Sequence, residues 1–319
     1  MGVATTGART ANTTEPALWG LVGNTPLVPV NTEAVGDARA RLFVKAEWLN
    51  PGGSVKDRPA REIMRAGLAE GALPSRRLLD ASSGNTAVAY AMLGAAARIG
   101  VTMCVPANAS QERFRLLALC GAEVIETDPL EGSDGAIRRA REMAEAAPER
   151  YWYPDQYGHR ANPDSHYRTT GPEIWRQTEG AVTHLVAGVG TSGTLMGAGR
   201  FLREMRSDIR LISVEPDSPF HGLEGLKHMA TAMVPSIYDP SLIDETIFVE
   251  TESAELKVRA LARDQGLPVG WSTGAALVAA DLVVGEDHQS SAAAHPLVVI
   301  IGPDGAGRYL SETRRWLGD

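Results

Sequence analysis

Short apolar runs alternate with longer helical patterns along almost the whole sequence, and this order limits the fold more than any other feature. Runs such as "RLFVKAE" (41–47), "VTMCVPA" (101–107) and "PLVVIIG" (296–302) predict buried strands. Longer stretches such as "PAREIMRAGLAEGAL" (59–73) predict helices between the strands. Strands that alternate with helices build parallel sheets covered on both faces, so we predict an α/β chain made of doubly wound parallel sheets.

The same alternation divides the chain into two series on either side of residues 151–167, "YWYPDQYGHRANPDSHY", which predict an irregular junction that lines a cleft. A length of 319 residues favours two domains. The further predicted strands are 76–82, 122–128, 182–190 and 209–216. The further predicted helices are 86–100, 110–121, 135–149, 193–205, 257–267, 274–286 and 307–317.

Composition excludes several classes of protein. The formal net charge of -8 argues against a nucleic-acid binder, which normally presents a basic face. The two cysteines, Cys104 and Cys120, lie in apolar runs and read as core residues, so we expect neither a disulfide scaffold nor a metal site. No apolar run has the length of a membrane span, and residues 1–16 lack the apolar centre of a signal peptide. We expect a cytoplasmic protein with a disordered tail over residues 1–16.

The loop after the predicted strand 182–190 has the composition of a phosphate site. It contains Gly190, Thr191, Ser192, Gly193 and Thr194 and leads into a helix. Glycines let the backbone approach a ligand closely, successive N–H groups converge on one point, and the helix dipole favours negative charge there. The three hydroxyl groups add further hydrogen-bond donors. The loop therefore predicts a phosphate-binding cradle.

A rival interpretation of the same loop is a dinucleotide site. Gly188, Gly190 and Gly193 spell G-x-G-x-x-G, and Glu215 ends the next predicted strand, where a ribose-binding acid would lie. This pattern favours an NAD-dependent oxidoreductase. It leaves the hydroxyl groups of the loop and the lysine discussed below without a role.

A second loop joins strand 76–82 to its helix and is rich in donors. Its residues are Ser82, Ser83, Gly84, Asn85 and Thr86. The same physics predicts an anion site here, of a size for a carboxylate. The alternative is a plain helix cap in which Ser83 or Asn85 bonds only to its own backbone.

A lone lysine lies in the stretch "NPGGSVKDRPA" (50–60). By itself the stretch is typical of a turn that leads into a helix, with Ser54 as the cap and Lys56 in the solvated first turn. Among small residues shielded from water, however, a lysine becomes neutral more readily and can act as nucleophile or base. A phosphate cradle, a carboxylate cradle and an amine together indicate pyridoxal phosphate chemistry.

The order of these motifs resembles the fold-type II pyridoxal-phosphate enzymes, the cysteine synthase and cystathionine β-synthase group. The resemblance covers about residues 18–317. It rests on "LVGNTPLV", "NPGGSVKDRPA", "SSGNTAVAYAM", "GVGTSGTLMGAGRFLRE", "GWSTGAAL" and "GRYLSE". It implies a smaller domain over residues 32–151 that carries the lysine and the substrate loop. It also implies a larger domain over residues 17–31 and 152–319 that binds the cofactor phosphate.

The resemblance implies roles for single residues. Lys56 would hold the cofactor covalently and shuttle the α-proton, Asn85 would bond the ring hydroxyl, and Ser272 would face the pyridine nitrogen. The residues implied for the phosphate are Gly190, Thr191, Ser192, Gly193 and Thr194. The residues implied for the substrate carboxylate are Ser82, Ser83, Gly84, Thr86 and Gln156. The implied reaction is β-replacement, in which a serine derivative loses its β-substituent to give an aminoacrylate and sulfide then adds to form cysteine.

The branch of the family is indicated by "HGLEGLKHMATAMVPSIYDPSLID" (221–244) and "ANPDSHYRTTGPE" (161–173), which look most like the actinobacterial cysteine synthase B type. Relatives of that type accept O-phosphoserine, and Lys227 falls where they place an arginine for the substrate phosphate. Lysine offers a point charge without the bidentate fork of arginine. A solvated surface lysine is the alternative for Lys227, and O-acetylserine is the alternative donor.

The sequence departs from the family pattern at two positions, and several alternatives for its reaction and partners stay open. Ala87 replaces a usual glycine, and Gly53 stands where many cysteine synthases carry serine or threonine. Another donor or nucleophile, as in a cystathionine β-synthase that uses serine or a diaminopropionate-type synthase, remains an alternative reaction. A scaffold without catalytic activity is a further alternative. The resemblance also implies a homodimer, and a small sulfur-carrying protein is an alternative source of sulfur to free sulfide.

Overall fold

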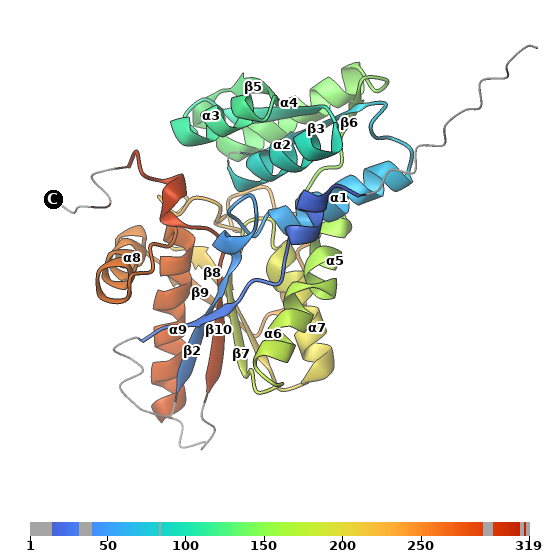
Figure 1. Cartoon of the computed structure of the whole chain (residues 1–319). Helices are drawn as coiled ribbons and strands as arrows, with labels where there is room; N and C mark the ends of the chain where they lie inside the picture. Colours follow the sequence, from blue (N-terminus) through green and yellow to red (C-terminus); the bar gives the residue numbers. More distant parts are fainter. Residues whose placement is uncertain (1–14, 32–39, 83, 290–295, 313–315, 317–319) are drawn as a thin grey trace, which may run out of the picture.

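The structure is a computed structural model that describes residues 15–31, 40–82, 84–289, 296–312 and 316 (Figure 1). Residues 1–14 of the predicted disordered tail lie outside the described residues. None of the helices in the described ranges combines the length and apolar composition that a bilayer span needs.

In the described ranges the strands form two sheets. The larger sheet has the order β1-β2-β10-β7-β8-β9, and its one antiparallel pair is β1 with β2. Its strands are β1 (Leu27–Pro29), β2 (Arg41–Ala46), β7 (His184–Gly188), β8 (Arg210–Pro216), β9 (Glu245–Val249) and β10 (Leu297–Gly302). The smaller sheet has the order β5-β4-β3-β6 and is parallel throughout. Its strands are β3 (Arg77–Ala81), β4 (Val101–Pro106), β5 (Glu123–Thr127) and β6 (Tyr151–Trp152).

The helices connect these strands in chain order. The α-helices are α1 (Asp57–Ala69), α2 (Asn85–Ala97), α3 (Gln111–Leu119), α4 (Gly132–Ala146), α5 (Ala161–Arg168), α6 (Thr170–Gln177), α7 (Gly193–Met205), α8 (Thr251–Gln265) and α9 (Trp271–Gln289). The 3₁₀ turns are η1 (Ala17–Leu21), η3 (Glu47–Leu49), η4 (Pro129–Glu131), η5 (Pro240–Leu242) and η6 (Ala306–Arg308). The predicted α/β class is confirmed.

Both faces of the larger sheet are buried because successive side chains of a strand point to opposite sides. In β7, Leu185 packs with the core beneath α6 and α7, whereas its neighbour Val186 packs with the core beneath α8 and α9. In β10, Val299 and Ile300 divide between the same two cores. This arrangement explains why the central strands read as continuous apolar runs in the sequence.

The smaller sheet is covered in the same way. Leu78 of β3 packs with the core formed with α1 and α2, and the next residue, Leu79, packs against α4. Figure 1 shows this sheet and its helices as one layered unit above the larger sheet, with α1 at the level between the two and α5 beside the larger sheet. The carboxyl ends of β3 and β7 lead directly into α2 and α7, so the loops 82–86 and 189–193 open the N-termini of those helices.

The structure differs from the predicted domain bounds at η1, whose Trp19 packs in the core of the smaller sheet although we assigned residues 17–31 to the larger domain, and at β2. We assigned residues 32–151 to the smaller domain, but β2 pairs along its full length with β10 of the larger sheet. The apolar pattern of β2 identifies a strand and does not tell which sheet it joins. The turn that carries Lys56 also packs against the larger unit, because Val55 lies in the core beneath α6 and α7.

The prediction of an irregular junction over residues 151–167 is wrong in part. The segment begins with β6 and contains most of α5, a short polar helix that the sequence pattern did not reveal. Buried Asn162 and Ser165 explain this outcome, because α5 packs against α7 with polar side chains that read as loop residues. The predicted closing helix 307–317 begins instead as η6 followed by a turn, and much of its remainder lies outside the described residues.

Candidate active site

The turn that carries Lys56 is fastened to the end of β10. Ser54 forms an isolated antiparallel bridge with Asp304, and the Val55 N–H donates to the carbonyl oxygen of Pro303 at 2.8 Å. Lys56 then precedes α1 with helical backbone angles. The predicted solvated first turn is therefore wrong, because this turn lies between the two sheets rather than on the surface.

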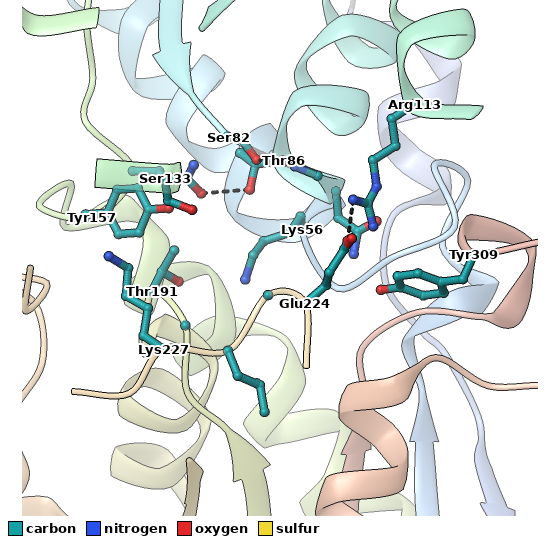
Figure 2. Close-up of a pocket in the computed structure, with 16 residues that line it drawn as sticks. Lys56, Ser82, Thr86, Arg113, Ser133, Tyr157, Thr191, Glu224, Lys227 and Tyr309 are labelled. Atoms are coloured by element: carbon teal, nitrogen blue, oxygen red, sulfur yellow. Dashed lines mark hydrogen bonds and ion pairs between the residues drawn. The ribbon is translucent and has the colours of Figure 1, made fainter. Parts of the chain in front are cut away.

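The Lys56 amine points into a pocket between the sheets (Figure 2). Burial lowers the pKa of Lys56 to about 8, since the charged form loses its hydration, and the negative charge of Asp304 opposes this shift. A substantial fraction of such an amine is neutral near pH 8 and is available as nucleophile or base.

The loop 190–194 forms a rigid cradle at one side of this pocket. Its polar residues Thr191, Ser192 and Thr194 are all buried, and Ser192 has the left-handed backbone conformation, with φ of 67°. A Cβ atom at residue 190 would overlap the carbonyl oxygen of Gly225, and one at Gly193 would overlap the side chain of Asn162. Glycine is therefore required at both positions, and the loop ends at the N-terminus of α7, where the helix dipole favours an anion.

The second loop is held by side chains. The Thr86 hydroxyl donates to Gln156 Oε1 at 2.7 Å, and Gln156 Nε2 donates to the carbonyl oxygen of Ala81 at 2.7 Å. The Gly84 N–H donates to the Ser82 hydroxyl at 3.1 Å. Gln156, which is distant in sequence, thus joins the loop as predicted from the resemblance. Ser83 lies outside the described residues.

Beneath Lys56 lies an inner cavity that the two loops share. Its polar lining includes Lys56, Asn85, Thr191, Ser192, Thr194, Ser272 and Asp304. Ser272 lies in the first turn of α9, far in sequence from both loops. The structure therefore brings together the lysine, the phosphate loop, Asn85 and Ser272, as expected. It also adds Asp304, which the sequence interpretation missed because an aspartate after a buried strand reads as a turn residue.

The rim of the pocket carries two ion pairs that cross between its two sides. Lys227 donates to Asp134 Oδ1 at 3.0 Å and lies 5.0 Å from the centre of the Tyr157 ring. Arg113 of α3 pairs with Glu224, which comes from the same loop as Lys227 (Figure 2). Lys227 is buried and lines the pocket, so the alternative of a solvated surface lysine is wrong. Arg113 and Glu224 were missed because each lies in a charged stretch with no motif.

Glu215 does not face either pocket. It is buried, and its Oε2 accepts the backbone N–H of Met229 at 2.9 Å. The acid that the dinucleotide interpretation required therefore fixes the chain between β8 and the rim instead of lining a ribose site. The dehydrogenase role of Glu215 is wrong for this reason.

Gly53 has a structural reason for departing from its usual residue. Its φ of 77° is in the left-handed region, and a Cβ would lie 3.0 Å from Arg308 Nη2. Arg308 also donates to the carbonyl oxygen of Gly52. A serine or threonine would be strained here, so the glycine matches the arginine that packs on it.

The donors of the inner cavity fit a phosphorylated aldehyde with a polar ring. Within the described part of the chain, Ser192 Oγ and Asn85 Oδ1 are buried without a hydrogen-bond partner. Buried polar groups are normally satisfied, so unpartnered ones that line a cavity mark positions where a ligand bonds. Pyridoxal phosphate offers a phosphate for the loop, an aldehyde for Lys56, a ring hydroxyl for Asn85 and a ring nitrogen for Ser272.

Comparison with known proteins agrees with this fit. The family described as "Pyridoxal-phosphate dependent enzyme" matches residues 18–302. The chain is 45% identical over 294 residues to a cysteine synthase of Aquifex aeolicus, an alignment that covers 91% of this chain and 89% of the relative.

Solved structures have the same fold over nearly the full chain. A cysteine synthase from Entamoeba histolytica superposes with a TM-score of 0.86 at 31% identity, over 99% of this chain and 94% of that one. An O-acetylserine dependent cystathionine beta-synthase from Helicobacter pylori superposes with a TM-score of 0.84 at 32% identity, over 92% of this chain and 96% of that one.

Proposed function

The chain belongs to the family of pyridoxal-phosphate dependent enzymes, and from this premise we propose that it catalyses β-replacement on a serine derivative to form L-cysteine. One observation carries the proposal: the amine of half-buried Lys56 lines a pocket between a backbone cradle for a phosphate and a side-chain loop for a carboxylate. The relatives named as cysteine synthases support the same reaction type.

Pyridoxal phosphate, when bound, supplies an electron sink that stabilises negative charge at the α-carbon of an amino acid. Lys56 Nζ would hold the aldehyde of the cofactor and, once released, would accept the α-proton of the substrate. Burial suits both tasks, because it leaves Lys56 with a pKa of about 8 rather than the ordinary value of a lysine.

The residues around the amine would orient the cofactor. The backbone of Gly190 to Thr194 would bind its phosphate, and Asn85 would bond its ring hydroxyl. Ser272 would face the ring nitrogen. A neutral hydroxyl at that position leaves the nitrogen largely unprotonated, which suits elimination of a β-substituent better than transamination.

The second loop would bind the carboxylate of the amino acid. Ser82, Gly84 and Thr86 line the pocket beside Lys56, and Ser83 is proposed with them from the resemblance. Gln156 would position Thr86 through the hydrogen bond between them. Bonds at the carboxylate fix the α-carbon over the amine that must take its proton.

For the donor we propose O-phosphoserine, with O-acetylserine as the competing choice. Lys227 supports O-phosphoserine, because it places a positive charge at the rim of the pocket. The ion pair with Asp134 neutralises part of that charge, so the preference over a donor with an uncharged β-substituent would be modest.

The test is a parallel titration of the purified yellow protein with O-phosphoserine, O-acetylserine and serine, followed by sulfide. We expect a change in the visible spectrum with the first two donors and cysteine as the product after sulfide is added. A protein that binds no pyridoxal phosphate would refute the proposal. Product formation only with homocysteine or an amine would assign the alternative nucleophiles instead.

The assembly and the sulfur source are proposed from the family. From the resemblance alone we propose a homodimer in the cytoplasm, supplied by free sulfide or by a small sulfur-carrying protein. Light scattering measures the assembly, and comparison of sulfide with a thiocarboxylated carrier protein measures the source.

A further inference from the structure

One fully buried carboxylate lines the inner cavity together with Lys56 and Asn85. Asp304 follows β10 in "GPDGAG" and is 1% exposed. Its Oδ2 accepts hydrogen bonds from Asn85 Nδ2 and from the Tyr309 hydroxyl, both at 2.6 Å. Within the described part of the chain, its other oxygen, Oδ1, is buried without a partner. A buried charge with these contacts is costly unless it has a function or further partners.

The backbone holds this carboxylate in a fixed relation to the lysine turn. Asp304 forms the bridge with Ser54, two residues before Lys56. On its other side a Cβ at Gly270 would overlap Asp304 Oδ1, so the start of α9 is packed against the carboxylate. The three segments that meet here therefore keep the carboxylate and the amine in one cavity.

The hydrogen bond to Asn85 also fixes the orientation of that amide. Asn85 Nδ2 is engaged by Asp304, which leaves Asn85 Oδ1 as the buried atom without a partner in the described residues. A carboxylate accepts hydrogen bonds only, so it selects the NH₂ group of the amide and disfavours the flipped orientation. Asp304 thereby determines which atom of Asn85 is left for a ligand.

Positively charged groups and neutral hydrogen-bond donors lie around the carboxylate. Burial raises the pKa of Asp304, while hydrogen bonds from Tyr309 and Asn85 and the positive charges of Arg113 and Arg308 lower it. Toward Lys56, Asp304 is the group whose negative charge favours the ammonium form. Tyr309 is buried beside the same carboxylate, which raises the pKa of its hydroxyl, so it remains a neutral donor.

We propose that Asp304 is a positioning residue of the active site: it orients Asn85 for the cofactor ring and supplies the negative charge that faces Lys56. The inference rests on the proposed roles of Lys56 and Asn85. Asp304 would place a negative charge on the side of the cavity that holds Lys56. The phosphate loop, by contrast, would present partial positive charge from its N–H groups.

The first test measures the protonation of Lys56 in the full-length chain freed of cofactor. Trace labelling with an amine-reactive reagent across pH, followed by peptide mapping, gives the midpoint for Lys56. In Asp304→Asn, loss of the negative charge shifts this midpoint to lower pH. If the substitution merely loosened the site, water would reach Lys56 and the midpoint would move to higher pH, toward that of an ordinary lysine. That result, or an unchanged midpoint, would overturn the proposal.

A matched control is Asp281→Asn. Asp281 lies in α9, pairs with Lys257 of α8 and lines neither pocket. We expect this variant to leave the midpoint of Lys56 unchanged. A shift equal to that of Asp304→Asn would show that any lost carboxylate has the same effect and would contradict the proposal.

The second test asks whether Asp304 acts through Asn85. The dissociation constant for pyridoxal phosphate is measured in Asp304→Asn, Asn85→Ala and the double variant. We expect each single substitution to weaken binding by about tenfold, as for loss of one hydrogen bond that involves a charged group. We expect the double variant to be no weaker than Asn85→Ala alone. Independent, additive losses would contradict the action through Asn85.

Reduction of the wild-type protein with borohydride tests the proposed function separately from the role of Asp304. If Lys56 carries the cofactor and Asp304→Asn leaves both measurements unchanged, the proposed function stands and the role of Asp304 fails. If Lys56 carries no cofactor in the wild type, the proposed function itself fails.

Discussion

The two anion loops have the same origin and are built in different ways. Both leave the carboxyl end of a parallel strand and open a helix, one over residues 82–86 and the other over residues 190–194. In the loop 190–194 the backbone itself is packed, because a Cβ at Gly190 would overlap the carbonyl oxygen of Gly225. In the loop 82–86 the contacts are made by side chains, through the bond between Thr86 and Gln156.

The difference matches the lifetimes of the two proposed ligands. A cofactor that stays bound gains from preformed N–H groups that need no rearrangement on binding. A substrate that enters and leaves at each turnover is better served by side chains, whose bonds can be remade. Substitutions in the two loops should therefore affect different steps.

The largest effect is expected for Gly190→Ala. The added methyl group must displace backbone that carries the rim residues, and overpacking of this kind costs about 1–3 kcal/mol of folding stability. We expect at least a hundredfold loss of affinity for pyridoxal phosphate, measured by equilibrium titration. Gly285→Ala is the control, since open space surrounds Gly285 in α9. Normal cofactor affinity in Gly190→Ala would show that cofactor binding does not depend on the packed backbone of the loop 190–194.

The next effect concerns the amine between the loops and its dependence on pH. Only the neutral amine attacks the aldehyde, and the pKa of Lys56 is about 8. The rate of cofactor attachment to the cofactor-free chain should therefore rise nearly tenfold per pH unit well below pH 8 and level off above it, which is about fiftyfold between pH 6 and pH 8. Stopped-flow absorbance measures this rate. A rise that continued to pH 10 would show that Lys56 is not desolvated.

A smaller effect is expected for Thr86→Val in the side-chain loop. The substitution leaves the buried Oε1 of Gln156 without a hydrogen-bond donor, which lowers the free energy of unfolding by about 1–3 kcal/mol. We expect kcat/KM for the amino-acid donor to fall by about tenfold or more, while the dissociation constant for pyridoxal phosphate stays within about twofold. Thr86→Ser keeps the hydroxyl and should retain most of the activity. Parallel loss of cofactor binding in Thr86→Val would show that the loops act as one unit.

The smallest effect is expected at the rim. Asp134→Asn releases Lys227 from its ion pair and leaves its positive charge for an anionic leaving group. We expect kcat/KM to rise by about twofold to fivefold for O-phosphoserine and to stay unchanged for O-acetylserine, in line with the energy of a partly exposed ion pair. Lys227→Met should lower the O-phosphoserine value alone. Equal changes with both donors would exclude Lys227 as a determinant of donor choice.

The sequence could predict those parts of the site whose residues lie close together in the chain. The loop of Gly190 and the loop of Asn85 each combine a strand, small polar residues and a helix start within about fifteen residues, so their chemistry is readable in one window. Gln156, Ser272 and Lys227 followed from the resemblance rather than from any local pattern.

The parts that could not be predicted depend on packing between distant segments. Asp304 looks like a turn residue until β10 is placed beside the lysine turn. The pairing of Arg113 with Glu224 joins two charged stretches 111 positions apart. β2 matches the pattern of a strand, yet only its pairing with β10 shows which sheet it belongs to.

We propose that Lys56 is the residue that binds pyridoxal phosphate covalently. Borohydride reduction of the purified yellow protein, followed by proteolysis and mass spectrometry, tests it directly. We expect a single phosphopyridoxyl tag, on Lys56, and none in Lys56→Ala treated in the same way. A tag on another lysine, or a protein that reduction leaves untagged, would contradict the account.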